Sequence, residues 1–146
     1  MKIAVLNGPN LNLLGTREPE IYGRHTLKDI ERSLRTLAKE LGATLEFAQH
    51  NGEGELIDRV HTWRGVVGGA LVNAGAYSHT SLALRDALVG TAIPFVEVHL
   101  TNIYAREPER RHSMLSVAAV GVVCGFGAAS YDLALRAMVA HLAKNA

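Results

Sequence analysis

Short apolar runs alternate with longer amphipathic runs along the whole chain, and this alternation limits the fold more than any other feature of the sequence. The apolar runs predict strands at residues 3–6, 44–49, 66–72, 94–99 and 117–123. The amphipathic runs predict helices at residues 27–41, 53–63, 78–88 and 128–143. Alternation of this kind is typical of an α/β fold with a parallel sheet covered by helices on both faces. Five strands favour the flavodoxin-like order 2-1-3-4-5, in a single domain that spans residues 1–146.

The clearest boundary signals surround the first predicted helix. Thr26 can cap its N-terminus, and Asp29 follows three residues later in the position of a capping box. Leucine and isoleucine side chains then recur at helical spacing as far as Leu41, and Gly42 ends the run. The segment is therefore expected to form an amphipathic helix that packs on the sheet.

Composition and charge exclude several classes of protein. The 146 residues carry a formal net charge of +1, which is too balanced for a nucleic-acid binder. Cys124 is the only cysteine, so an intrachain disulfide is impossible, and a small buried hydrophobe is its ordinary role. The first apolar run is too short for the core of a signal peptide, and no run approaches the roughly 18 apolar residues of a membrane helix. We therefore expect a cytoplasmic protein that binds neither nucleic acid nor membrane.

Polar residues follow the first, third and fourth predicted strands. In a sheet of this order, ligands bind beyond the carboxyl ends of the strands, at the point where the strand order reverses. The residues at these ends are Asn7, Asn10, Arg17 and Tyr22, then Asn73 and His79, then Glu97, His99, Thr101 and Arg110. Because loops are polar in general, their position supports a site without establishing one.

Tyr22 lies on a loop bounded by proline and glycine, five residues after Arg17. A free tyrosine has a pKa of about 10 and is a poor base at neutral pH. A nearby guanidinium favours the phenolate, and lowering the pKa by about two to three units requires roughly 3–4 kcal/mol of differential stabilisation. Tyr22 is therefore a candidate base. The same spacing also fits a tyrosine that anchors the loop beside a solvated arginine.

Glu97 and His99 are two residues apart in the fourth predicted strand, so their side chains should point to the same face. A carboxylate that accepts from one imidazole nitrogen fixes the tautomer and raises the basicity of the other nitrogen. The pair is a candidate general acid held by a carboxylate, or a strand-end histidine with satisfied hydrogen bonds. The third helix is expected to open at Ser78 or His79, and its positive dipole end would favour a neutral His79.

Several common motifs are absent or incomplete. Ser130 stands where a dinucleotide-binding fingerprint beginning at Gly125 would need glycine, and the segment lies far from the first strand. The chain has no Gly-Lys-Ser/Thr phosphate loop and no Gly-x-Ser-x-Gly nucleophile elbow. His79 and His99 belong to no recognisable metal-ligand motif, so no metal site is expected. A non-enzymatic flavodoxin-like module is an alternative, but a receiver domain needs aspartate where this chain has Asn73, and residues 7–14 lack the hydroxyl groups typical of a flavin-binding loop.

The motifs together resemble the type II 3-dehydroquinate dehydratase family. The segment NGPNLNLLGTREPEIYG at 7–23 resembles the family's N-terminal signature almost throughout. Further matching segments follow in order: GELID at 54–58, HTS at 79–81, LRDAL at 84–88, EVHLTN at 97–102 and CGFG at 124–127. The resemblance covers nearly the whole chain, and the first and fifth of these motifs are its most specific parts.

The resemblance implies loss of water from 3-dehydroquinate to give 3-dehydroshikimate, in the shikimate route to aromatic amino acids. It implies an anti elimination through an enolate, with no Schiff-base lysine, metal or organic cofactor. Tyr22 would remove the proton alpha to the ketone, and Arg17 would activate Tyr22 on a lid that closes over the substrate. Asn10 would position a water molecule at the enolate oxygen. His99 would protonate the leaving hydroxyl, with Glu97 orienting it.

The resemblance also implies which residues contact the substrate. The ring hydroxyls and their surroundings would be bound by Asn73, His79 and Arg110. The substrate carboxylate would receive backbone N–H groups from Leu100 and Thr101.

A homo-oligomer is implied as well, because the family assembles as trimers grouped into dodecamers, in which Asp86 would reach the site of a neighbouring subunit. Departures from the family's pattern are minor: Ala74 stands where proline is usual, and Tyr104 where histidine is more usual. Arg111 adjoins Arg110, so the choice between the two stays open. A family member that has lost activity and persists as a structural assembly is a second alternative, against which the intact catalytic residues argue.

Overall fold

The computed structural model describes residues 1–16, 18–22 and 24–146, and for residues 21 and 22 it describes the backbone alone. Within these residues, a sheet of five parallel strands has the order β2-β1-β3-β4-β5. The strands are β1 (Lys2–Asn7), β2 (Thr44–Gln49), β3 (Gly69–Asn73), β4 (Phe95–His99) and β5 (Gly121–Cys124). The helices are α1 (Pro19–Tyr22), α2 (Leu27–Glu40), α3 (Glu53–Trp63), α4 (Leu82–Gly90) and α5 (Ala129–Lys144). The predicted flavodoxin-like strand order is confirmed.

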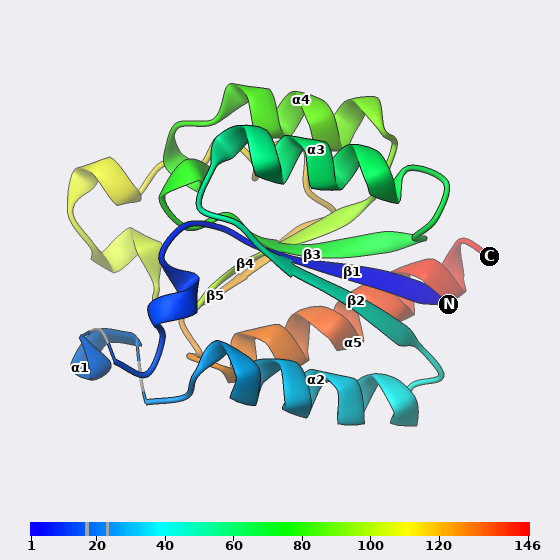
Figure 1. Cartoon of the computed structure of the whole chain (residues 1–146), viewed down its shortest axis with the longest axis horizontal. Helices are drawn as coiled ribbons and strands as arrows, with labels where there is room; N and C mark the ends of the chain where they lie inside the picture. The colour runs from blue at the N-terminus through cyan, green and yellow to red at the C-terminus, as the bar shows by residue number, and fades with distance from the viewer. Residues whose placement is uncertain (17, 23) are drawn as a thin grey trace.

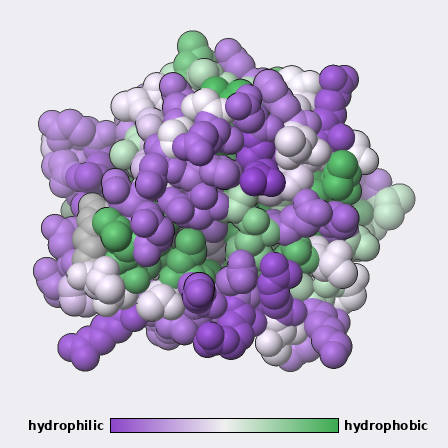
Figure 2. Space-filling model, viewed as in Figure 1, coloured by the Kyte–Doolittle hydropathy of each residue, from purple (hydrophilic) through white to green (hydrophobic). Residues whose placement is uncertain are grey.

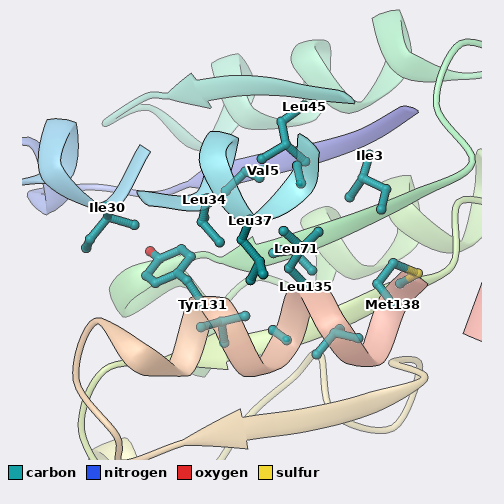
Figure 3. Packing of buried hydrophobic residues seen from close by; sticks show 14 of the residues in the cluster. Ile3, Val5, Ile30, Leu34, Leu37, Leu45, Leu71, Tyr131, Leu135 and Met138 are labelled. Carbon is teal, nitrogen blue, oxygen red and sulfur yellow. The ribbon is translucent and has the colours of Figure 1, made fainter. Parts of the chain in front are cut away.

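Helices cover both faces of the sheet, with α3 and α4 on one side and α2 and α5 on the other (Figure 1). On the α2 and α5 side, Tyr131 and Leu135 of α5 are fully buried in one core with Leu34 of α2 and Leu71 of β3 (Figure 3). Each fully buried aliphatic side chain of this kind contributes about 1.5–3 kcal/mol. The opposite core is built from the apolar stripes of α3 and α4, including Leu56, Trp63, Leu84 and Leu88.

The predicted capping box of α2 is present. Oγ1 of Thr26 accepts from the backbone N–H of Asp29 at 3.1 Å, and Oδ2 of Asp29 accepts from the backbone N–H of Thr26 at 3.0 Å. These two bonds satisfy N–H groups that the first turn of a helix leaves without partners. The bounds of β2 and α3 also agree with the prediction.

Three predicted boundaries are wrong by three residues or more. Helix α4 begins at Leu82 rather than at Ser78 or His79, because Oγ of Ser81 caps it by accepting from the N–H of Leu84 at 2.9 Å. The residues before it form the 3-10 turn Gly75–His79. Strand β3 starts three residues later than residue 66, and β5 starts four residues later than residue 117.

The late start of β5 shows that an apolar residue in the sequence does not always belong to a strand. Val117 lies in a turn and is 81% exposed, so this apolar residue belongs to the surface. The loop predicted between the first strand and the first helix also contains regular structure, namely the 3-10 segment Leu11–Leu13 and the short helix α1. Cys124 is partly buried rather than buried.

The face of the molecule seen in Figure 1 is mostly hydrophilic, with smaller hydrophobic areas between the hydrophilic side chains (Figure 2). In the described part of the chain, no helix has the length and apolar character needed to cross a membrane.

Candidate active site

A cavity of about 110 Å³ opens at the carboxyl ends of β1, β3 and β4, where the strand order predicts a ligand site. Its walls come from the loops that follow these strands. The lining residues are Pro9, Asn10, Leu11, Asn73, Gly75, Ala76, His79, His99, Leu100, Thr101, Ile103, Arg106 and Arg110. Of the predicted site residues, the cavity therefore brings together Asn10, Asn73, His79, His99, Leu100, Thr101 and Arg110.

His99 and Glu97 form a buried pair on one face of β4. His99 is 5% exposed, Glu97 is fully buried, and Nε2 of His99 is hydrogen-bonded to Oε2 of Glu97. Burial alone would raise the pKa of Glu97, but the hydrogen bond and charge of His99, with hydrogen bonds from Ser113 and Ser116, hold that pKa below its ordinary value. An ionised carboxylate only accepts, so Nε2 donates and Nδ1 is the nitrogen left for a substrate. The predicted contact is confirmed, and its catalytic role stays a prediction.

His79 stacks on His99, with 6.2 Å between the ring centroids and 17° between the planes. Its Nδ1 donates to the carbonyl oxygen of His112 at 2.6 Å, so neutral His79 offers Nε2 as an acceptor. Burial is the main cause that lowers the pKa of His79, and the charges of His99 and Arg110 lower it further. The predicted neutral form is therefore supported. The predicted cause is wrong, because α4 begins only at Leu82.

The loop after β1 approaches the loop after β3 very closely. The N–H of Gly8 donates to the carbonyl oxygen of Asn73 at 2.8 Å. A Cβ atom on Gly8 would lie 2.2 Å from the carbonyl oxygen of Ala74, so a larger residue would push the two loops apart. Asn10 has a φ of 69°, a left-handed conformation that asparagine tolerates better than most residues. Its N–H donates to Oδ1 of Asn51 at 3.1 Å, a contact that the sequence did not predict.

A neutral hydrogen-bond network lies beneath the same edge of the sheet. Oη of Tyr131 donates to Oδ1 of Asn7 at 2.5 Å and accepts from Nδ2 of Asn73 at 2.9 Å. Oδ1 of Asn73 accepts from the N–H of Gly75 at 3.2 Å. Burial raises the pKa of Tyr131 above its ordinary value, so the phenol stays protonated. These contacts orient the amide of Asn73 at the cavity. Asn7 was named among the strand-end residues without a role, and Tyr131 was not predicted to belong to the site.

Of the two adjacent arginines in the loop after β4, Arg110 lines the cavity and pairs with Glu107. Nε of Arg111 instead donates to the carbonyl oxygen of Arg106 at 2.6 Å. This placement favours Arg110 as the substrate ligand. Arg106 also lines the cavity and was missed, because the sequence offers no signal that separates it from a solvated surface arginine.

Of the remaining predicted residues, Asp86 and Glu97 do not line the cavity. Arg17 lies outside the described residues, and so does the side chain of Tyr22, whose backbone ends α1. Asp86 is exposed on α4, and Glu97 lies behind His99. Among the described His, Cys, Asp and Glu side chains, no group of three or more is arranged to hold a metal ion.

Comparisons with known proteins agree with this architecture. A 3-dehydroquinate dehydratase of Gemmatimonas aurantiaca is 64% identical over 142 residues, which cover 97% of this chain and 93% of that protein. A 3-dehydroquinate dehydratase of Prochlorococcus marinus is 61% identical over 142 residues, which cover 97% of this chain and 98% of that protein.

Solved structures of similar chains share the fold. The type II dehydroquinase from Butyrivibrio crossotus has a TM-score of 0.92 at 37% identity, covering 96% of this chain and 97% of that one. The type II dehydroquinase from Propionibacterium acnes has a TM-score of 0.90 at 40% identity, covering 95% of this chain and 96% of that one. The family model described as dehydroquinase class II matches residues 1–139. Given this match over nearly the whole sequence, together with the shared fold, the chain belongs to the class II dehydroquinase family.

Proposed function

We infer that this chain is a 3-dehydroquinate dehydratase, a hydro-lyase that removes water from 3-dehydroquinate and leaves 3-dehydroshikimate. The family match over residues 1–139 and the relatives at 61–64% identity support this reaction. The structural observation that carries it is the buried Glu97–His99 pair, whose histidine lines the cavity at the strand ends.

In the first step of the proposed reaction, Tyr22 acts as the base and Arg17 activates it. The C–H bond alpha to the ketone breaks, the proton passes to the phenolate, and the electron pair moves onto the carbonyl oxygen to form an enolate. Asn10 would hold a water molecule that donates to the enolate oxygen. The position of Asn10 in the cavity wall supports its role. The roles of Tyr22 and Arg17 rest on the resemblance of segment 7–23 to the family's signature.

In the second step, His99 acts as the acid. The enolate collapses to the ketone, a C=C bond forms, the C–O bond breaks, and the leaving hydroxyl takes a proton from Nδ1 of His99 and departs as water. Nε2 of His99 faces Glu97, so the negative carboxylate offsets the positive charge of the protonated ring before the transfer. After product release, Tyr22 gives its proton to water and His99 takes up a proton from water, which restores the starting state.

The other cavity residues support the proposed substrate contacts. The neutral His79 offers Nε2 as an acceptor for a ring hydroxyl, and the oriented amide of Asn73 offers a second polar contact. The guanidinium of Arg110, which also lines the cavity, supplies further donors. Leu100 and Thr101 follow β4 directly, and their backbone N–H groups are the proposed ligands of the substrate carboxylate.

We also propose a place in the shikimate route to aromatic amino acids and an assembly of trimers grouped into a dodecamer. Asp86 is exposed on α4, and exposure leaves its carboxylate available to the site of a neighbouring subunit. Light scattering on the purified protein would measure the assembly. The cytoplasmic location stays a prediction.

An ultraviolet assay for the conjugated enone product tests the function directly. Purified protein is mixed with 3-dehydroquinate in the presence of a chelator, and the assay is repeated after borohydride treatment with substrate present. We expect product in both cases, because neither a metal nor a Schiff-base lysine is expected to take part. Well-folded protein that forms no product would contradict the proposal and favour an inactive assembly. Loss of activity with chelator or borohydride would contradict the cofactor-free mechanism.

A further inference from the structure

The two oxygens of the Glu97 carboxylate face different partners. Oε2 contacts Nε2 of His99, as described above. Oε1 accepts two hydrogen bonds from a segment that follows in the sequence, one from Oγ of Ser113 at 2.9 Å and one from Oγ of Ser116 at 2.8 Å. Within the described residues, a fully buried carboxylate is thus surrounded by three donors.

The direction of the Ser113 hydrogen bond is set by the backbone around it. Oγ of Ser113 accepts from the N–H of Leu115 at 3.1 Å and from the N–H of Ser116 at 3.3 Å. A hydroxyl has two acceptor lone pairs and one proton, so the proton of Ser113 is left to point at Oε1 of Glu97. Oε1 therefore acts as an acceptor and carries no proton of its own.

We propose that Ser113 and Ser116 are positioning residues for the acid, holding Glu97 ionised with Oε2 directed at Nε2 of His99. The inference deepens the proposed dehydratase function and rests on it, because it assigns the serines to the step in which His99 protonates the leaving hydroxyl. With the serines in place, Glu97 keeps its negative charge, Nε2 of His99 donates to Oε2, and Nδ1 is left for the cavity.

Removal of the serine donors weakens the ionised state of Glu97. Burial raises the pKa of Glu97 and is offset by the bonds from His99, Ser113 and Ser116. Without the hydroxyls, the buried carboxyl group takes up a proton more easily, and a neutral Glu97 no longer offsets the positive charge that His99 needs to act as an acid. The charged or titratable groups around the Glu97–His99 pair are His79 after β3 and Arg110 after β4.

Ser116→Ala is the decisive variant, because the Ser116 hydroxyl contacts Glu97 while the turn itself is held by Ser113. We expect kcat to fall about tenfold, the loss typical of one hydrogen bond to a buried charge. KM should change by less than about threefold, because the ground-state contacts with substrate are kept. The acid-side limb of the kcat profile should move to higher pH, since Glu97 then takes up a proton more easily. Ser113→Ala combined with Ser116→Ala should lower kcat about 100-fold.

Two further variants separate positioning from folding. Ser116→Thr keeps a hydroxyl and should retain most of the activity. Ser78→Ala is the matched control, because Ser78 is fully buried, its carbonyl accepts from the N–H of Met114 at 2.7 Å, and its hydroxyl has no hydrogen-bond partner among the described residues. Ser78→Ala should leave kcat and its pH profile unchanged. Urea unfolding of all variants checks that the fold is kept.

A titration of the Glu97 carboxyl carbon by ¹³C NMR tests the inference without turnover. We expect its midpoint to move to higher pH in Ser116→Ala and to stay in place in Ser78→Ala. An active wild type whose Ser116→Ala variant keeps kcat within about twofold and the same acid limb would overturn the inference and leave the dehydratase function intact. An inactive wild type would overturn the function, and the NMR titration would still decide whether the serines hold Glu97 ionised.

Discussion

Among the described residues, two buried hydrogen-bond networks meet the edge of the sheet below the cavity, and they differ in charge. The first joins Glu97 and His99 on β4 with the hydroxyls of the loop that follows. The second joins Asn7 of β1 and Asn73 of β3 through Tyr131 of α5, and every member is neutral. Both include one residue of the cavity wall, which is His99 in the first network and Asn73 in the second.

The difference shows how burial serves two purposes at one site. A buried charge costs several kcal/mol unless it is paired and hydrogen-bonded. We therefore expect a buried charged network where the reaction needs its ionised groups. A buried neutral network stabilises a fixed geometry without storing a proton for transfer. We therefore expect changes in the charged network to affect turnover most, and changes in the neutral network to affect stability most.

The largest effect is expected from Tyr22→Phe, which compares the proposed base with the buried tyrosine. Burial keeps Tyr131 protonated, so it is unsuited to remove a proton, and the base is expected to be Tyr22. Tyr22→Phe should abolish turnover and exchange of the alpha proton in D₂O, while substrate binding and urea stability stay close to those of the wild type. Steady-state kinetics, NMR exchange and calorimetry measure these quantities. Tyr104→Phe is the control, because Tyr104 is 57% exposed and should tolerate the change. Near-normal turnover in Tyr22→Phe would remove it as the base.

The next effect concerns the charged network itself. His99→Ala should lower kcat by about 10²–10⁴, the usual contribution of a general acid. It also leaves Glu97 buried without the imidazole that donates to Oε2, so the free energy of unfolding should fall as well. Kinetics with 3-dehydroquinate and urea unfolding measure the two changes. His61→Ala, on the exposed face of α3, serves as control. A rate unchanged in His99→Ala would show that another group donates the proton.

The sequence predicts those parts of the site that depend on short-range geometry. Glu97 and His99 could be paired from their spacing of two residues, because side chains of a strand alternate between faces. The capping box of Thr26 and Asp29 could also be predicted, because both partners lie within one helical turn. Signals of this local kind also place β2 and α3 correctly.

Contacts made by tertiary packing were not predictable. Tyr131 reaches Asn7 across 124 residues, and Ser116 reaches Glu97 across 19. Contacts over such separations do not follow the periodicity of a helix or a strand, so no sequence pattern indicates them. The start of α4 was misplaced because two nearby serines can each cap a helix, and only the structure shows that Ser81 does so. The roles of Tyr22 and Arg17 stay predictions.

Tyr131→Phe removes the centre of the neutral network. The amides of Asn7 and Asn73 then lose a buried partner, so the free energy of unfolding should fall by about 1–3 kcal/mol. KM should rise moderately, because the amide of Asn73 is no longer fixed at the cavity, while kcat should change little. Urea unfolding and steady-state kinetics measure both effects. A loss of kcat comparable to that of His99→Ala would contradict the division of roles between the two networks.

The smallest effect is expected on the pH dependence of the free energy of unfolding. It distinguishes the two networks because only the charged one contains a group that titrates in the acid range. His79 and Glu97 both have a lower pKa in the folded protein, so the unfolded chain takes up protons first as the pH falls. The stabilisation that these two groups contribute should therefore be complete above pH 6.5, the ordinary pKa of His79, decrease below it, and decrease again below 4.5, the ordinary pKa of Glu97. Asp29, whose pKa is also lowered, adds to the loss below 3.8. Urea unfolding across this pH range should show that Tyr131→Phe lowers the free energy of unfolding by the same amount at every pH, because the neutral network does not titrate there. The variant His79→Gln should lack only the loss of stability that begins below pH 6.5. If the free energies of unfolding of Tyr131→Phe and the wild type converged at low pH, the two networks would be coupled.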